Sequence, residues 1–187
     1  MALQVEELTA DYTGMINEAD YQEYIRYDGT DQSTILPIMV ESAIRQAESY
    51  CNASFGLKTY KLQKTDYNIA CDIYLPFAPI LSVSGVNVIS EDGNTTALVL
   101  GTDYRVGGLN RKYISLLSGL VSLNSIVEVE YTAGTAIPAN INPQIKEGIL
   151  TILSENFENR MEGLEGSVSK MLRNSKVKLA PFRNNVY

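Results

Sequence analysis

The stretch Val129–Ile149, VEYTAGTAIPANINPQIKEGI, passes from a strand pattern to a helix pattern within a few residues, and it decides the fold. Before Gly134, the apolar residues Val127, Val129 and Tyr131 alternate with Glu128, Glu130 and Thr132, which is the period of a β-strand. A helix is predicted to begin at Asn142-Pro143, because Asn is a favourable N-cap and Pro is favoured at the first helical position. We expect this strand and helix to pack on each other as the core, with an exposed corner between them.

Two regions have helical periodicity, the one that begins at Asn142 and the first fifty residues. After Asn142, a buried stripe is expected from residues three and four apart: Ile145, Ile149, Ile152, Leu153 and Phe157. The first fifty residues also read as helical, with a short helix near Tyr21–Ile25 and a longer one from Thr34 to Cys51. In the longer helix the stripe is Leu36, Val40, Ala43, Ile44, Ala47 and Cys51, and the solvent-facing side is marked by Glu41, Arg45 and Glu48.

From about Lys58 to Thr132 the pattern is that of short strands. Alternating apolar residues occur in ILSVSGVNVIS, where Gly85 marks a possible bulge, and Asp92-Gly93 between two apolar runs predicts a hairpin. About six strands are expected, in a meander or a small barrel-like sheet.

The expected fold is therefore α+β, with N-terminal helices, a small antiparallel β-sheet of about six strands, a C-terminal helix and a basic tail. Residues 1–160 are interpreted as one domain. The polar, glycine-containing stretch Met161–Ser169 is interpreted as a flexible linker, so that residues 161–187 form a linker and a C-terminal docking tail.

Charge is distributed unevenly along the 187 residues. Up to Glu165 there are ten basic and 22 acidic residues, a net charge of −12, whereas Gly166–Tyr187 has five basic and no acidic residues, a net charge of +5. An acidic body with a basic tail indicates that the tail contacts an acidic surface, on its own chain or on a neighbour.

The composition removes several kinds of chemistry. The chain has no histidine, which excludes His-dependent nucleophiles. Its two cysteines, Cys51 and Cys71, are far apart in the sequence and cannot build a structural zinc site. They are interpreted as reduced core thiols, with a disulfide between them as the alternative. No phosphate-binding glycine motif is present. The segment Tyr27–Ser33, YDGTDQS, resembles part of a calcium loop but lacks the ligand spacing and the terminal Glu, and a turn between helices explains it equally well.

Carboxylate pairs remain as candidate acid–base groups, namely Asp66 with Asp72 and Glu128 with Glu130. Glu128 and Glu130 lie two residues apart, as on a solvated strand edge, and we favour that interpretation over catalysis. No enzyme activity and no cofactor or metal is expected. Double-stranded DNA is not expected to bind specifically, because the body is acidic.

Several segments, taken in order, resemble a known family. They are LPFAPILSVSGV, the hairpin ISEDGNTTALVLGTDYRV, VEVEYTAG, IPANINPQIKEGILTILSENFENR and a terminal LAPFR. Together they resemble the phage head–tail connector family, the small adaptor or head-completion proteins of tailed bacteriophages and prophages. The expected N-terminal helices carry little of the family's leading pattern, and the insert Met161–Ser169 separates the last helix from the tail.

The resemblance implies a structural protein that forms a ring below the portal, extends the DNA channel and joins head to tail. Its implied partners are copies of itself, the portal protein, a downstream neck or tail-completion protein, and double-stranded DNA passing through the channel. The implied location is the virion neck at the capsid vertex, after synthesis in the bacterial host cytoplasm. No membrane association is expected, since the chain has no apolar run of spanning length and no secretory signal pattern.

Candidate partner-binding residues follow from the tail and the corner. For docking of the tail they are Arg173, Lys176, Lys178, Leu179, Pro181, Phe182, Arg183 and Tyr187, a mixture of apolar anchors and basic groups. Subunit-interface candidates are Thr135, Ala136, Ile137, Pro138, Glu41 and Glu48. Alternatively, the tail folds onto the chain's own acidic helices, and the corner is a plain surface loop.

A rival hypothesis is a non-viral, β-rich module that binds protein or carbohydrate. An acid–base enzyme that uses only Asp or Glu is a third and weaker hypothesis. Size in solution distinguishes the first two, because ring-sized assemblies or concentration-dependent association favour the connector.

Overall fold

The computed structural model describes residues 3–26, 35–65, 72–117, 124–162 and 168–184, with side chains described outside 159–173. The chain divides into two compact units. We call Met1–Asp11 with Gly56–Ala136 the sheet unit, and Tyr12–Phe55 with Ile137–Tyr187 the helical unit. The predicted boundary at residue 160 does not coincide with this division, because the chain passes between the units at Asp11, Phe55 and Ala136.

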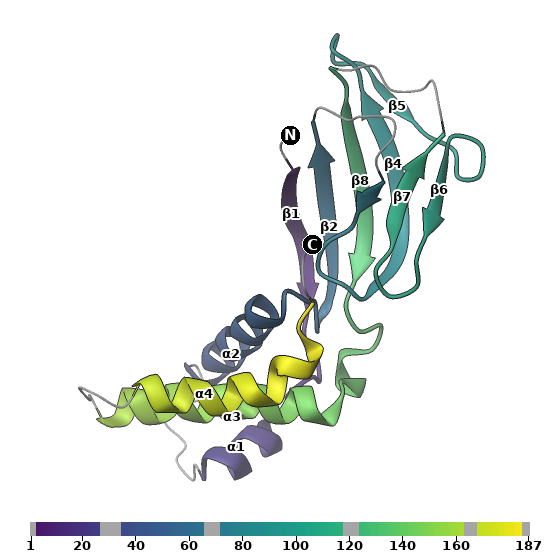
Figure 1. Ribbon diagram of the computed structural model, residues 1–187. Coiled ribbons are helices and arrows are strands. Elements are labelled where there is room, and N and C mark those ends of the chain that lie inside the picture. The colour runs from purple at the N-terminus through teal and green to yellow at the C-terminus, as the bar shows by residue number, and fades with distance from the viewer. Residues whose placement is uncertain (1–2, 27–34, 66–71, 118–123, 163–167, 185–187) are drawn as a thin grey trace. The chain divides into compact units, whose positions relative to one another are not determined.

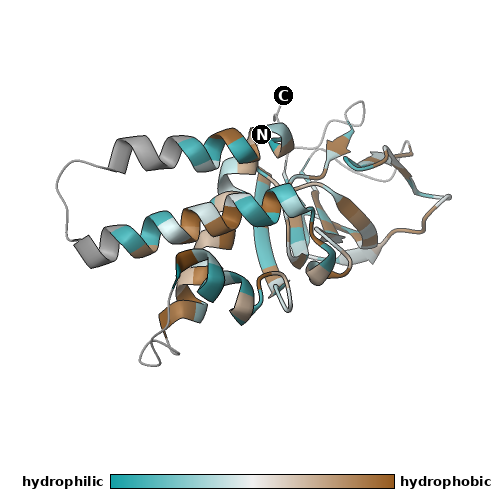
Figure 2. Cartoon of the chain, turned by 90° about the horizontal axis from the view of Figure 1, so that it is seen from below, coloured by the Kyte–Doolittle hydropathy of each residue, from teal (hydrophilic) through white to brown (hydrophobic). Residues whose placement is uncertain are grey.

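The helical unit contains four described helices and two short 3₁₀ turns. The helices are α1 (Glu18–Ile25), α2 (Ile35–Cys51), α3 (Pro143–Glu162) and α4 (Val168–Leu179), and the turns are Pro138–Asn140 and Ala180–Phe182. Helices α3 and α4 lie side by side and run in opposite directions (Figure 1). In Figure 2 the described parts of the helices carry hydrophobic segments in brown beside hydrophilic segments in teal, as amphipathic helices do.

The predicted apolar stripes form the core of the helical unit. Every stripe residue named for α2 is buried, and so are Ile145, Ile149, Ile152 and Leu153 of α3, with Phe157 packed against them. The predicted start of α3 is confirmed, since the backbone N–H of Gln144 donates to Oδ1 of Asn142 over 2.9 Å. The spacing of apolar residues thus predicts both long helices and their buried faces.

The sheet unit contains two antiparallel sheets. The strands are β1 (Leu3–Asp11), β2 (Leu57–Lys64), β3 (Ile73–Tyr74), β4 (Ile80–Ile89), β5 (Thr95–Ala97), β6 (Tyr104–Gly107), β7 (Tyr113–Leu116) and β8 (Ile126–Ala133). The larger sheet has the order β1-β2-β8-β4-β5, and the smaller has the order β3-β7-β6. The α+β class is confirmed, but the described residues form eight strands in two sheets rather than about six in one.

Strand β8 is the centre of the larger sheet, hydrogen-bonded to β2 on one side and β4 on the other. Val127, Val129, Tyr131 and Ala133 are fully buried in the core of this unit. The ring of Tyr60 stacks on Tyr131, with centroids 5.5 Å apart. Alternation therefore predicts correctly which face of β8 is buried.

Two local predictions in the sheet are confirmed. The register of β4 against β8 shifts between Val83 and Gly85, which is the predicted bulge. β4 and β5 pair as a hairpin around Asp92-Gly93, where Gly93 has a φ of +81° and its N–H donates to the carbonyl of Ser90. A left-handed φ at this position explains the preference for glycine.

Three predictions are wrong. The first residues form strand β1 rather than helix, because they pair with β2 from Leu3 to Asp11. Glu128 and Glu130 lie on a central strand rather than a sheet edge. The strand ending near Gly134 and the helix from Pro143 do not share a core, because β8 belongs to the sheet unit and α3 to the helical unit.

Some predictions fall outside the described residues. These are the calcium-like segment 27–33 and the positions Asp66, Cys71 and Tyr187. Within the stretch predicted as a linker, α3 extends to Glu162 and α4 begins at Val168. No helix within the described residues is long and apolar enough to cross a membrane.

Candidate functional site

The end of α4 is anchored in the core of the helical unit. Leu179, at the end of α4, is 1% exposed, and its side chain lies against Gly148 of α3. A Cβ on Gly148 would stand only 2.6 Å from Cδ2 of Leu179, so glycine allows the two helices to approach closely here. Leu179, a predicted docking residue, is therefore a core residue of its own chain.

Lys178 contacts the adjacent helix. Its Nζ lies 2.8 Å from Oε1 of Glu147 and 3.1 Å from Oγ1 of Thr151, both on α3. The hydrogen bond to Glu147 is the largest cause of a raised pKa at Lys178, so the lysine stays charged. This contact corresponds to the alternative that the tail folds onto the chain's own acidic helices.

Two further basic groups of the tail gather over one aromatic ring. The Nζ of Lys176 lies 5.9 Å and the Cζ of Arg183 lies 5.7 Å from the centre of the Tyr50 ring in α2, which are cation–π distances. Beyond the last 3₁₀ turn, the N–H of Asn184 donates to the carbonyl of Cys51 over 2.7 Å. The chain is thereby tied to the last turn of α2.

Cys51 is a buried thiol at this junction, as its interpretation as a core thiol requires. Its Sγ lies 3.5 Å from the carbonyl oxygen of Leu179. Burial raises its pKa to about 11, with the positive charge of Arg183 acting in the opposite direction. The thiol is therefore protonated at neutral pH and is a poor nucleophile.

A carboxyl group is also buried between α3 and α4. Glu155 is 7% exposed and accepts a hydrogen bond from Oγ of Ser175, which is 2% exposed, over 3.3 Å. Burial is the main cause of a raised pKa at Glu155. The group is placed to hold the two helices together most strongly in its neutral form.

The remaining predicted docking residues are more accessible. Pro181 and Arg183 are exposed, and Phe182 is half-buried against the helical core. The side chain of Arg173, although its backbone is in α4, and all of Tyr187 lie outside the described residues. The exposed groups of the tail that a partner can reach thus form a basic surface beside Tyr50.

The predicted corner is the point where the chain leaves the sheet unit. Thr135 and Ala136 end that unit, and Ile137 and Pro138 begin the helical unit. Ile137 is 58% exposed, whereas Pro138 is buried at the start of a 3₁₀ turn. Ala136 and Ile137 are therefore available for a contact with another chain, and Pro138 is not.

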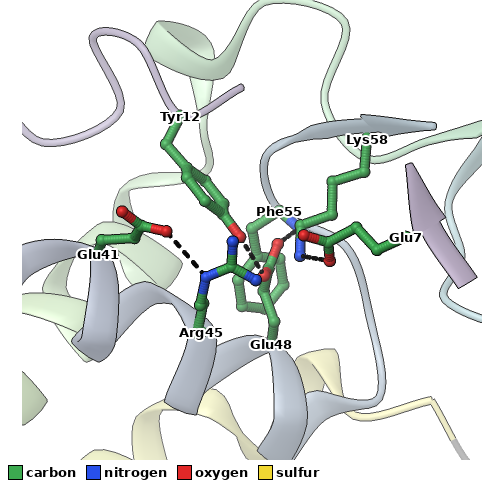
Figure 3. A network of polar contacts seen from close by, with 7 residues as sticks. All are labelled: Glu7, Tyr12, Glu41, Arg45, Glu48, Phe55 and Lys58. Carbon is green, nitrogen blue, oxygen red and sulfur yellow. Dashed lines mark hydrogen bonds and ion pairs between the residues drawn. The ribbon is translucent and has the colours of Figure 1, made fainter. Parts of the chain in front are cut away.

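The two glutamates of α2 that were predicted at an interface differ from each other. Glu41 is exposed and pairs with Arg45 over 2.9 Å. Glu48 is only 5% exposed, and it accepts hydrogen bonds from the Tyr12 hydroxyl over 3.0 Å and from the Phe55 N–H over 2.8 Å (Figure 3). The prediction that Glu48 faces solvent is wrong, because its carboxylate bonds to groups of its own unit.

The candidate acid–base pair on β8 is part of a structural network. Glu128 accepts from Nε2 of Gln63 over 2.8 Å, and this bond is the main cause of its lowered pKa. Nζ of Lys61 lies 3.5 Å from Glu128 and 3.4 Å from Glu130. Strands β2 and β8 are thus linked by polar and charged side chains. Among the described residues, no three acidic or cysteine side chains are grouped to hold a metal ion.

Sequence reasoning missed Tyr50, the residue on which the tail rests. Tyr50 lies near the end of α2 beside the buried stripe, so periodicity places it between the buried and the solvent-facing side of the helix and indicates no contact. Sequence reasoning also missed β1, whose side chains are almost all exposed. A strand that pairs at a sheet edge without contributing to the core has no periodic apolar signal.

No protein-family model matches the chain, and no curated protein matches it. Solved structures do. A chain from the neck of an empty gene transfer agent particle, in a reconstruction with C6 symmetry, has a TM-score of 0.75 at 16% identity, over 98% of this chain and 97% of the other.

Two related structures give the same score and the same coverage of both chains. One is the virion of the native gene transfer agent particle, at 18% identity, and the other is the neck of the native particle in a reconstruction with C12 symmetry, at 16% identity. The likeness extends over both units rather than over a single motif. The chain therefore has the fold of a subunit found in the neck of a phage-like particle.

Proposed function

We propose that this chain is a structural head–tail connector of a tailed bacteriophage or prophage, which forms a ring below the portal, extends the DNA channel and joins head to tail. The observation that carries the proposal is the likeness to gene transfer agent neck chains over 98% of the chain. A β-rich binding module of another kind would leave the helical unit without an explanation. The proposed location is the virion neck, after synthesis in the host cytoplasm.

Symmetry supports the ring. Two of the similar chains come from neck reconstructions with C6 and C12 symmetry. A closed ring requires two different, complementary surfaces on each subunit. The acidic body and the basic tail supply surfaces of opposite charge.

The charge also suits a channel for DNA. The body has a net charge of −12, and an acidic wall repels phosphates, so a duplex passes without being held. The role proposed is structural and non-catalytic, with the portal and a downstream neck or tail-completion protein as further partners.

The direct test is removal of the gene from the phage or prophage that encodes this chain. Filled heads and separate tails are expected to accumulate, and wild-type protein supplied in trans should restore joined particles seen by electron microscopy. Normal joined particles in the deletion strain would overturn the proposal.

The tail is proposed to dock on the portal or on a neighbouring subunit. Truncation after Arg160 is a poor test of this docking, because it also removes Leu179 from the core. A point variant that keeps Leu179 is therefore needed. The double change Lys176→Glu and Arg183→Glu reverses two exposed charges that lie over the Tyr50 ring, and it leaves Leu179 in the core. Head–tail joining should fall, whereas the matched control Val177→Thr, at a position 67% exposed in α4, should not affect it. Full joining by the double variant would exclude docking through these charges.

A further inference from the structure

The hairpin between β6 and β7 ends in a basic knob. We use this name for Arg105, Leu109, Arg111 and Lys112. Leu109 is 89% exposed, the largest value among the exposed large hydrophobic side chains of the described residues. Arg105 and Arg111 are exposed as well. The same hairpin thus carries one highly exposed apolar side chain and two exposed positive charges, a combination that can meet an apolar surface with negative charge beside it.

The knob has a fixed conformation. Gly108 has a φ of +85°, and a Cβ there would stand 2.1 Å from the carbonyl oxygen of Arg111, so the turn requires glycine. The carbonyl of Asn110 accepts from the N–H of Ile80 over 2.8 Å, and Nζ of Lys112 donates to the carbonyl of Leu81 over 2.5 Å. Because the tip is held by bonds to β4, Leu109 is presented to solvent by a rigid hairpin rather than by a loose loop.

The helical unit carries a groove of complementary character, which we call the acidic groove. It has a volume of about 340 Å³ and is lined by apolar surface from Ile16, Tyr21, Val40 and Ile44. The exposed carboxylates of Glu18 and Glu41 also line it. Arg45 pairs with Glu41, and Gln22 donates to Glu18, so these neighbours hold both carboxylates in place.

We infer that the basic knob of one copy inserts Leu109 into the acidic groove of a second copy. Leu109 would be buried against the apolar lining, while Arg105 and Arg111 would face Glu18 and Glu41. Opposite charges around an apolar contact guide the encounter and select the orientation. A knob and a groove on different units of one chain form a head-to-tail contact, which is the kind that closes a ring. This inference rests on the proposed ring and names the surfaces that build it.

Cross-linking between two differently tagged copies tests the contact. In a background with Cys71→Ser, one copy carries Leu109→Cys and the other Glu41→Cys, while the native Cys51 is buried. Mild oxidation of the mixture should give a disulfide that joins position 109 of one tagged chain to position 41 of the other. Neither variant oxidised alone should give this product. Absence of this product at all concentrations up to roughly the millimolar range overturns the inference, as does a chain with both cysteines that forms only an internal disulfide.

Association of the chain measured by sedimentation is a second test. Leu109→Asp should weaken self-association about tenfold or more. Val99→Asp, a matched change to Asp at a position 59% exposed in the segment between β5 and β6, should leave it unchanged. Copies with Arg105→Glu and Arg111→Glu should associate with copies carrying Glu18→Lys and Glu41→Lys more strongly than either associates with itself.

The outcomes separate this inference from the proposed function. If the Leu109→Asp variant associates as strongly as the wild type, the knob-and-groove contact is overturned. A ring could then still form through other surfaces. A wild-type chain that stays monomeric also overturns the contact. The proposed connector function is tested separately, by head–tail joining in the gene-deletion strain.

Discussion

In the helical unit, residues from distant parts of the sequence meet in the core, whereas in the sheet unit the N-terminal strand lies at an edge with its side chains exposed. Leu179 packs on Gly148, and the N–H of Asn184 donates to the carbonyl of Cys51, so residues 179–184 help to close the helical core. Strand β1 instead adds backbone pairing to β2 and little buried surface. Changes in the first region should therefore act on a whole unit, and changes in the second should act locally.

The largest effect is expected from Leu179→Ala. Removal of a fully buried leucine typically costs about 3 kcal/mol of folding free energy. Hydrogen exchange should accelerate throughout α2, α3 and α4 and remain unchanged in β8. The control Val177→Ala, two residues away and exposed, should change stability by less than about 0.5 kcal/mol. Equal effects of the two changes would contradict the anchoring role of Leu179.

A smaller loss is expected from Glu48→Ala. The change removes the acceptor for the Tyr12 hydroxyl and for the buried Phe55 N–H, at a cost of about 2 kcal/mol. Glu48→Gln keeps one acceptor oxygen and should lose less. Denaturant unfolding measures both, and Glu41→Ala is the exposed control in the same helix. A Glu48→Ala variant as stable as the control would show that these bonds contribute nothing.

Glu7→Gln tests the edge of the sheet unit. The carboxylate of Glu7 lies 2.8 Å from Nζ of Lys58, whose side chain is only 5% exposed (Figure 3). Removal of one charge leaves a buried lysine with a weaker partner, and we expect a loss of about 1 kcal/mol. Faster amide exchange should be confined to β1 and the adjoining part of β2. Spread of the effect to α3 would contradict the local character of this edge.

The same contrast explains what the sequence could predict. Both long helices and their buried stripes follow from residues three and four apart, because the helices are buried on one face. Glu48 was misplaced because it continues the series of Glu41 and Arg45, although it also lies four residues after Ile44 and three before Cys51, both buried. A carboxylate at core spacing was the signal that could have located it.

In the sheet unit, the pattern predicts which face of a strand is buried but not which strand lies beside it. Glu128 was assigned to an edge because alternation looks the same on central and edge strands. Among the candidate binding residues, the sequence identifies the basic character of the tail. Burial of Leu179 and the position of Arg183 over the Tyr50 ring depend on contacts between distant residues, so they required the structure.

The smallest effect, and one of opposite sign, is expected from Glu155→Gln. Burial raises the pKa of Glu155, so the folded state favours the protonated carboxyl. The stability that results is fully present below the ordinary pKa of about 4.5 and is lost as pH rises through the raised value. Glutamine has no charge to bury and still offers an oxygen to Ser175. The variant should melt up to a few degrees higher than wild type at pH 7 and at the same temperature near pH 4.

Melting curves at a series of pH values check this prediction, with Glu23→Gln as the exposed control on α1. The control should follow the wild-type curve throughout. Because Glu155 lies between α3 and α4, the gain at neutral pH should appear as slower amide exchange in these two helices and not in the sheet unit. A Glu155→Gln variant that is less stable than wild type at pH 7 would mean that the ionised carboxylate, rather than the neutral form, stabilises the packing of α4 on α3.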